Sequence, residues 1–216
     1  MVYSLAMTAA PTDLRRRYTF AEYLAFEEAH EAKHEFHEGE ILAMSGSSPE
    51  HALITARVLR AIGNCIEGGP CQVYSSDLKI AAKPGARVSY PDGSIVCGPL
   101  EFDPNDPKHH VVTNPRVIIE VLSPTTEAYD RGDKFPHYRD IPSLAEYVLI
   151  SQYAPIVETF FRQSDGSWLI AGTFTGLDAR ARLRSLDIEI ALSDIYAGVE
   201  FPPPAPPPDP RERESL

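Results

Sequence analysis

Two short apolar runs each carry one acidic residue at a position where a strand is expected. The segment PRVIIEVLSP at residues 115–124 contains Glu120, and SYPDGSIVCG at residues 89–98 contains Asp92. An ionised carboxylate taken out of water costs several kcal/mol unless a partner or a metal compensates for its charge. The two runs therefore predict buried strands whose acids share a compensating group.

The size of the chain predicts one main domain. With 216 residues and 43% hydrophobic content, the chain can bury a substantial core. We expect a flexible leader over residues 1–17, a domain over 18–201 and a disordered, proline-rich tail over 202–216. No apolar run is long enough to span a membrane, and the basic residues near the start follow the short apolar stretch, the reverse of a secretory signal. We expect a cytoplasmic protein with no membrane partner.

The cysteines point to a reducing compartment. The chain has three, Cys65, Cys71 and Cys97, and they form no CxxC pair. An odd number without metal-ligand spacing favours small buried hydrophobic residues over a disulfide framework or a zinc site.

The net charge restricts how the chain could bind nucleic acid. At −11, the chain lacks the overall attraction that lysine and arginine provide for phosphates. Contact with DNA or RNA would need a local basic patch, metal ions that cover acidic ligands, or an oligomer.

The N-terminal half predicts two helices with a hairpin between them. Thr19 and Glu22 form a capping-box pattern that starts a helix ending near Ala32, and a turn at Glu38-Gly39 joins two short strands. Ser48 caps a second helix, which stops at Gly68-Gly69. Its apolar stripe contains His51, Ile54, Val58 and Ile62.

The remaining elements predict a mixed sheet. A weaker helix covers residues 126–139, where Pro136 should kink or split it. Strands are expected at residues 71–74, 78–82, 88–96, 116–122 and 144–151, followed by a hairpin around Asp165-Gly166 and closing segments at 186–190 and 192–196. This order favours an α/β or α+β sandwich with a mixed central sheet.

Alternation along the expected strand at residues 116–122 places Glu120 on one face with Ile118 and Leu122. Consecutive strands are usually neighbours, so Asp92 and Glu120 can converge near one end of the sheet. Two close carboxylates repel each other unless a cation lies between them. Hard oxygen ligands suit Mg²⁺, with Mn²⁺ as a substitute.

Pro91-Asp92 followed by Glu120 resembles the pattern of the PD-(D/E)XK nuclease superfamily. The segments HEFHEGEILAMS, SPEHALI, YPDGSIV, VIIEVLSPTTEAYDRGDK and SLAEYVLIS, in that order, resemble the Uma-two family of restriction-endonuclease-like bacterial proteins from about Arg17 to Phe201. The resemblance implies a restriction-endonuclease-like core, with a mixed central sheet flanked by helices and an added β-hairpin.

The resemblance also implies roles for individual residues. Asp92 and Glu120 would be the metal ligands, with the Val121 carbonyl as a third. The lysine that normally follows two residues after the glutamate is Leu122 here. Our candidate for the basic side chain that replaces this lysine is Lys134, and Lys79 is the reserve candidate.

Three further residues lie in segments that match the family: Glu35, Glu40 and His51. His51 could point toward the acids, bind a water of the metal, or hydrogen-bond Glu35. An ordinary core histidine is an equally good interpretation of it.

The implied function is a Mg²⁺-dependent endonuclease that hydrolyses DNA phosphodiester bonds, and pairing of sheet edges could build a homodimer. The alternative is a catalytically inactive nuclease-fold module that binds nucleic acid or protein. A third hypothesis is metal binding through His30, His34 and His37, although HEAKHEFH reads better as a solvated, charge-mixed helix end.

Overall fold

The computed structural model describes residues 16–44, 46–123 and 127–201. The expected leader, apart from residues 16 and 17, and the expected tail lie outside these residues, as does Thr126 at the start of the third expected helix.

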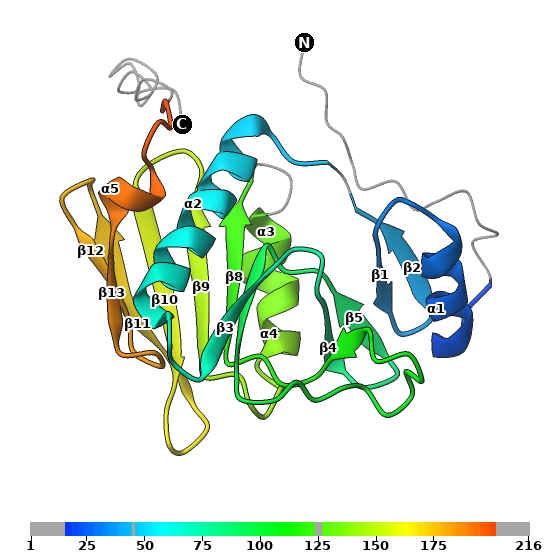
Figure 1. Ribbon diagram of the computed structural model, residues 1–216. Coiled ribbons are helices and arrows are strands. Elements are labelled where there is room, and N and C mark those ends of the chain that lie inside the picture. Colours follow the sequence, from blue (N-terminus) through cyan, green and yellow to red (C-terminus); the bar gives the residue numbers. More distant parts are fainter. Residues whose placement is uncertain (1–15, 45, 124–126, 202–216) are drawn as a thin grey trace, which may run out of the picture.

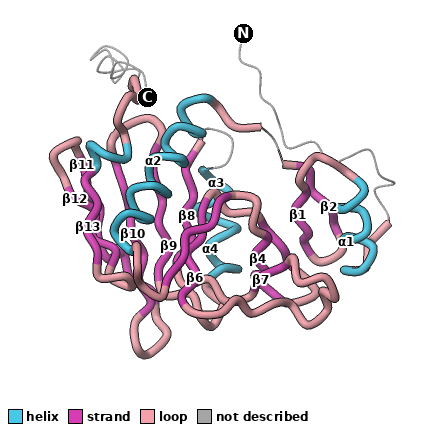
Figure 2. The backbone as a smooth tube through the Cα atoms, viewed as in Figure 1, coloured by secondary structure: helices cyan, strands magenta, loops and turns pink. Residues whose placement is uncertain are grey.

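A six-stranded mixed sheet forms the centre of the molecule (Figures 1 and 2). The strands follow the order β11-β10-β9-β8-β6-β3, and β8 and β9 are parallel while the other pairs are antiparallel. Their bounds are Cys71–Ser75 for β3, Gly93–Cys97 for β6, Val117–Leu122 for β8, Glu146–Ser151 for β9, Ile156–Arg162 for β10 and Trp168–Thr175 for β11. The expected mixed central sheet is confirmed.

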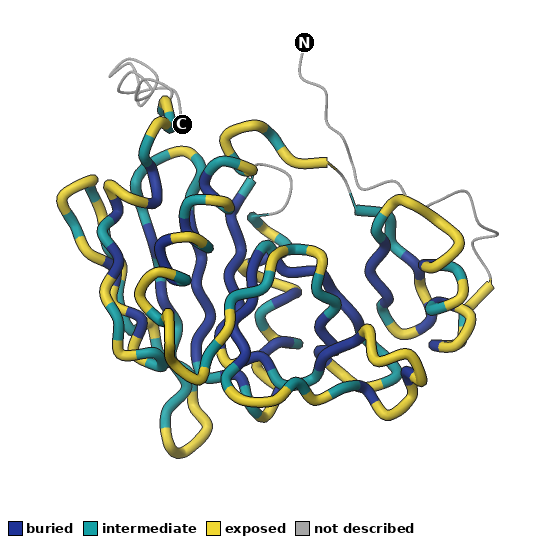
Figure 3. The backbone as a smooth tube through the Cα atoms, in the orientation of Figure 1, coloured by how far each residue is buried: buried dark blue, intermediate teal, exposed yellow. Residues whose placement is uncertain are grey.

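Both faces of this sheet are covered, so β8 is buried along its whole length (Figure 3). Val117, Ile119 and Val121 pack with helix α2 (Pro49–Ile66), the hairpin of β12 (Arg180–Leu183) and β13 (Ile188–Ala191), and α5 (Leu192–Ile195). Ile118 and Leu122 face the opposite side, where they pack with Tyr138 and Ile141. The alternation predicted from the sequence is confirmed, and Glu120 lies on the second face.

A second, five-stranded sheet carries the N-terminal part of the chain. Its order is β2-β1-β5-β4-β7, and helix α1 (Phe20–Ala29) packs against it through Phe20 and Tyr23, which contact Phe36. The strands are β1 (His34–His37), β2 (Glu40–Ala43), β4 (Lys79–Lys83), β5 (Arg87–Ser89) and β7 (Val111–Val112). In Figure 1, α1, β1 and β2 lie at the side of the molecule away from β12 and β13.

Local sequence signals explain where several elements begin and turn. Thr19 and Glu22 form the complete capping box, and Ser48 caps α2 by accepting a hydrogen bond from the His51 backbone. Glu38 and Gly39 have φ angles of 49° and 100°, the left-handed backbone that a two-residue hairpin turn requires. These predictions are confirmed, although α1 ends at Ala29 and not at Ala32.

The strand expected over residues 88–96 is wrong as a single element. It divides into β5 and β6, which belong to different sheets. Pro91 lies at the break, where a residue without an N–H group cannot continue a central strand. Asp92 therefore stands at the entrance to β6, at a corner between the two sheets, and not inside a strand. The short strands β7 and β12 were also not expected.

The helix expected over residues 126–139 is present but irregular. It consists of α3 (Glu127–Tyr129), a π-helical turn η1 (Asp130–Lys134) and α4 (Phe135–Tyr138). Pro136 lies in the first turn of α4, where its missing N–H is tolerated, and the irregularity comes before it. Single π turns inside helices occur frequently at functional sites.

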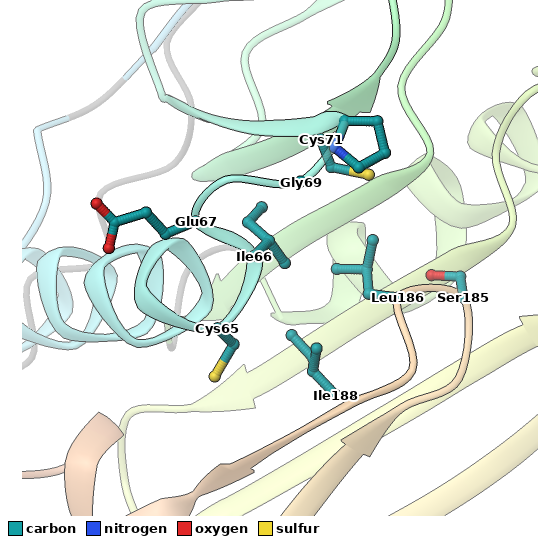
Figure 4. A pocket seen from close by; sticks show the side chains of 9 residues that line it. Cys65, Ile66, Glu67, Gly69, Cys71, Ser185, Leu186 and Ile188 are labelled. Atoms are coloured by element: carbon teal, nitrogen blue, oxygen red, sulfur yellow. The ribbon is translucent and has the colours of Figure 1, made fainter.

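The cysteine prediction is wrong. Cys71 and Cys97 face each other in the β3–β6 pair and form a disulfide, and Cys65 is exposed. Cys65 and Cys71 line a cavity of about 290 Å³ between the end of α2 and the segment before β13. Figure 4 shows the sulfur of Cys65 pointing away from Cys71. In the part of the chain that the structure describes, no helix is long and apolar enough to cross a membrane.

Candidate active site

Asp92 and Glu120 meet where β6 begins beside the middle of β8. The Val121 backbone donates to Asp92 Oδ2 over 2.7 Å, and the Asp92 backbone donates to Glu120 Oε2 over 3.3 Å. Gly93, opposite Ile119, lets α2 pack closely on the start of β6, because a Cβ at this position would lie 2.4 Å from Leu59 Cδ2. The two acids are thus next to each other, and both line one cavity.

Lys134 reaches the same point from the π-helical turn on the second face of the sheet. Its Nζ lies 3.2 Å from Glu120 Oε1, and both side chains are buried, with exposed fractions of 10% and 3%. Tyr138, one turn further along, donates from its hydroxyl to the same Glu120 oxygen over 3.1 Å. Position 122 holds leucine and not the lysine of the superfamily pattern, but Lys134 brings an amine to Glu120 from another segment.

Two more carboxylates surround the Lys134 amine. Glu35 Oε1 lies 3.5 Å from Nζ and comes from β1, and Asp130 Oδ1 lies 3.3 Å from Nζ within the π-helical turn itself. Asp130 and Lys134 are four residues apart and both buried, so the turn directs an acid and a base inward together.

Glu35 is bound on its other side by a small polar network. Its Oε2 accepts a hydrogen bond from the Tyr129 hydroxyl over 3.2 Å and lies 3.2 Å from His37 Nε2. Burial alone would raise the pKa of Glu35, but the charge of Lys134 and the bond from His37 lower it to about 2. Glu35 is therefore an ionised partner for Lys134 at neutral pH.

His51, in the first turn of α2, lies on the far side of Asp92. Its Nε2 is 3.2 Å from Asp92 Oδ2. Burial alone would lower the pKa of His51, but the hydrogen bond and charge of Asp92, with a bond to the Val121 backbone, raise it above its ordinary value. Of the roles considered for His51, the structure places it next to the acid pair and not next to Glu35.

Glu120 and Lys134 form a tightly coupled buried pair. Burial raises the pKa of Glu120, the Lys134 charge opposes this, and Asp130 and Asp92 raise it further, so that it lies well above its ordinary value. Burial lowers the pKa of Lys134, but the carboxylates around it, with Glu120 first, raise it well above its ordinary value. Lys134 is therefore a permanent cation at the centre of an excess of acids.

One cavity of about 810 Å³ lies between α2, the β1–β2 hairpin and the π-helical turn. The side chains described above that line it are Glu35, His51, Asp92, Glu120, Tyr129, Asp130 and Lys134. Asp92 and His51 are partly exposed, with side-chain exposures of 20% and 13%. The cavity gives a molecule from solution access to Asp92, with Glu120 and Lys134 behind it.

Three residues singled out from the sequence lie elsewhere. The Lys79 amine is 5.8 Å from the centre of the Tyr90 ring and forms no ion pair with Asp92 or Glu120, all of which are described residues. Glu40 is exposed and lies 3.8 Å from Arg17. His34 is not solvated as expected but buried, with Nδ1 3.0 Å from Glu27.

Sequence reasoning missed four members of the cluster: Asp130, Tyr129, Tyr138 and His37. Their spacing carries part of the signal. Asp130, Lys134 and Tyr138 are each four residues apart, the spacing of one helix face. Tyr129 and His37 could not be found in this way, because they meet through contact between β1 and α3.

The donor set is compatible with a divalent cation. Among residues 16–44, 46–123 and 127–201, no three histidine, cysteine or acidic side chains are arranged as ligands of one ion. What the cavity offers is a carboxylate pair, Asp92 and Glu120, surrounded by two further acids. Mg²⁺ is commonly bound through one or two carboxylates and keeps several waters, so this oxygen set fits it.

Comparison with known proteins places the chain among related proteins. The solved structure of a nuclease described as "putative" and "belonging to DUF820", from Anabaena variabilis, superposes with a TM-score of 0.65 at 18% identity and covers 83% of this chain and 97% of its own. That likeness concerns the fold.

Sequence relatives extend the likeness beyond the fold. Two uncharacterized proteins of Synechocystis are similar to the chain. The protein slr1290 is 39% identical, covering 83% of this chain and 92% of its own length, and sll1609 is 35% identical, covering 70% and 85%. Residues 20–193 match the family model Uma2, described as "Putative restriction endonuclease". The chain belongs to the Uma2 family.

Proposed function

We propose that the chain is a Mg²⁺-dependent endonuclease that hydrolyses DNA phosphodiester bonds in the cavity lined by Asp92 and Glu120. The observation that carries the proposal is the position of the Lys134 amine, 3.2 Å from Glu120 and adjacent to the acid pair. The description of the Uma2 family and of its structural relative as nucleases supports the same reaction class.

Each side chain has a proposed task. Asp92 and Glu120 hold the ion, and the Val121 carbonyl is a candidate third oxygen. Bound Mg²⁺ would supply Lewis-acid stabilisation of the phosphoryl oxygens. Lys134 places a fixed positive charge where negative charge increases during hydrolysis. Tyr138 orients Glu120 through the hydrogen bond from its hydroxyl.

Glu35 and Asp130 are proposed to position Lys134, not to contact the substrate. Both are almost completely buried and lie within 3.5 Å of its amine. His51, which is more exposed, is proposed to orient Asp92 through the 3.2 Å contact. Lys79 has no task in this proposal.

The test is a cleavage assay with isosteric variants. A mixed pool of DNA substrates is incubated with the protein and Mg²⁺ or Mn²⁺, with and without a chelator. We expect cleavage that needs the metal and falls at least about a hundredfold in Asp92→Asn and Glu120→Gln. Glu40→Gln, an exposed acid outside the cavity, is the matched control and should retain full activity.

The competing function is an inactive module that binds nucleic acid or protein. The engagement of Lys134 by three carboxylates favours it, because this amine already has partners. Metal-independent DNA binding without cleavage, unchanged in Asp92→Asn, would support the module and exclude the enzyme.

A further inference from the structure

We propose that the cavity accepts a single, flexible strand of DNA and excludes an intact duplex. This inference rests on the proposed function and specifies its substrate class. It starts from the depth at which the acids lie. Glu120 and Lys134 are buried, and Asp92, which lines the cavity, is 20% exposed.

The size of the cavity limits what can reach the acids. A volume of about 810 Å³ falls within the range of pockets that enclose a small molecule, about 300–1,000 Å³. A duplex, whose major groove alone is about 12 Å wide, cannot enter such a space. One strand can bend and insert a nucleotide with its phosphate.

The walls of the cavity carry apolar and hydroxyl side chains, which can contact the bases and sugars of a nucleotide. One side is formed by the exposed and half-buried face of α2, and the other by β2 and the residues that follow it. The aliphatic side chains of the lining are Ala32, Leu42, Met44, Ala52, Ala56 and Leu59. Serine and threonine hydroxyls also line the cavity, from Thr55 on α2, Ser75 at the end of β3 and Ser76 after it. Apolar and hydroxyl surface can hold an unstacked nucleotide without reading a duplex groove.

The charges of the cavity favour the same substrate. Four carboxylates line it, against two lysines in the described lining. Lys134 is held by its carboxylates, and Lys33 lies 2.6 Å from Asp77. A duplex carries one negative charge per about 1.7 Å of its axis, whereas a single strand carries one per about 3.4 Å. An acidic site repels the single strand less.

The test compares three forms of one labelled DNA sequence: the single strand, the blunt duplex and a relaxed, covalently closed circular duplex. Binding of the two linear forms is measured by fluorescence anisotropy without metal, and cleavage of all three is measured with Mg²⁺. We expect tighter binding of the single strand and cleavage of it alone.

Two variants connect the preference to the cavity. Ala56→Trp fills the cavity from the exposed side of α2 and should reduce single-strand binding and cleavage at least about tenfold. Ala52→Trp, one turn earlier, is a second variant of the same kind. Asn64→Trp adds the same bulk to an exposed position of α2 that is not part of the cavity, and it should behave as the unaltered protein. Circular dichroism checks that each variant is folded.

The outcomes separate the inference from the proposed function. Cleavage of the closed circle as fast as of the single strand, with Asp92→Asn still inactive, would overturn the inference and leave the nuclease intact. If the protein binds the single strand without cleaving it, and Ala56→Trp weakens that binding, the proposed nuclease activity is overturned. The inference that a single strand occupies the cavity is then retained. Equal binding of single strand and blunt duplex would overturn the inference.

Discussion

Replacement of Lys134 by methionine tests the electrostatic structure of the site. The amine is the shared partner of Glu120, Glu35 and Asp130, at 3.2, 3.5 and 3.3 Å. Methionine has a similar length but no charge, so the variant leaves three buried carboxylates without their cation. Removal of one member of a buried ion pair costs about 3–5 kcal/mol.

The pKa of Glu35 gives a second measure of how strongly this network stabilises a buried carboxylate. The pKa of Glu35 lies at about 2 against an ordinary value of 4.5, and Lys134 is the largest favourable cause. One pKa unit corresponds to about 1.4 kcal/mol, so the network stabilises this one carboxylate by about 3 kcal/mol. We therefore expect Lys134→Met to lower the free energy of unfolding by at least about 3 kcal/mol at pH 7.

Urea unfolding followed by circular dichroism measures this loss. Lys83→Met is the matched control, because Lys83 is 68% exposed and lies 3.9 Å from an exposed Glu38, and its loss should stay below about 1 kcal/mol. Addition of Glu35→Gln to Lys134→Met should restore part of the stability, because one uncompensated charge disappears. Equal losses for Lys134→Met and Lys83→Met, or no restoration in the double variant, would refute the reasoning.

Three further predictions concern stability and activity. Because the folded-state pKa of Glu35 is lowered to about 2, its stabilisation is present above about pH 4.5 and lost toward pH 2. Glu35→Gln should therefore flatten the decline of the unfolding free energy over that range, and a decline equal to that of the unaltered protein would contradict this. Tyr138→Phe removes the donor to Glu120 and should cost about 1–3 kcal/mol, with slower cleavage in the nuclease assay; unchanged stability and rate would count against an orienting role. Cys71→Ser opens the bridge to Cys97, whose sequence separation is 26, and should lower the unfolding free energy under oxidising conditions by about 3 kcal/mol, whereas the same change at the exposed cysteine of α2 should have no effect.

The sequence predicted those parts of the site that depend on local pattern. Alternation along β8 indicated which face Glu120 occupies, and the capping signal at Ser48 located the start of α2 and so the place of His51. These features follow from strand pleat and helix capping, which short segments determine by themselves.

The remaining parts depend on contacts between distant segments. The run through Pro91 looked like one strand because its residues are apolar, but the two sheets that share it are assembled from other parts of the chain. The disulfide requires the pairing of β3 with β6, which no spacing of the cysteines reveals. The π-helical turn, which directs both Asp130 and Lys134 inward, likewise cannot be deduced from the helical pattern of its segment.

The central claim is that Asp92 and Glu120 share one divalent ion, and diffraction from crystals soaked in Mn²⁺ tests it most directly. The account predicts an anomalous peak within roughly 2–2.5 Å of a carboxylate oxygen of each residue, absent from crystals of Asp92→Asn. A fully soaked crystal with no peak at the pair, or with the strongest peak at other ligands, would contradict it.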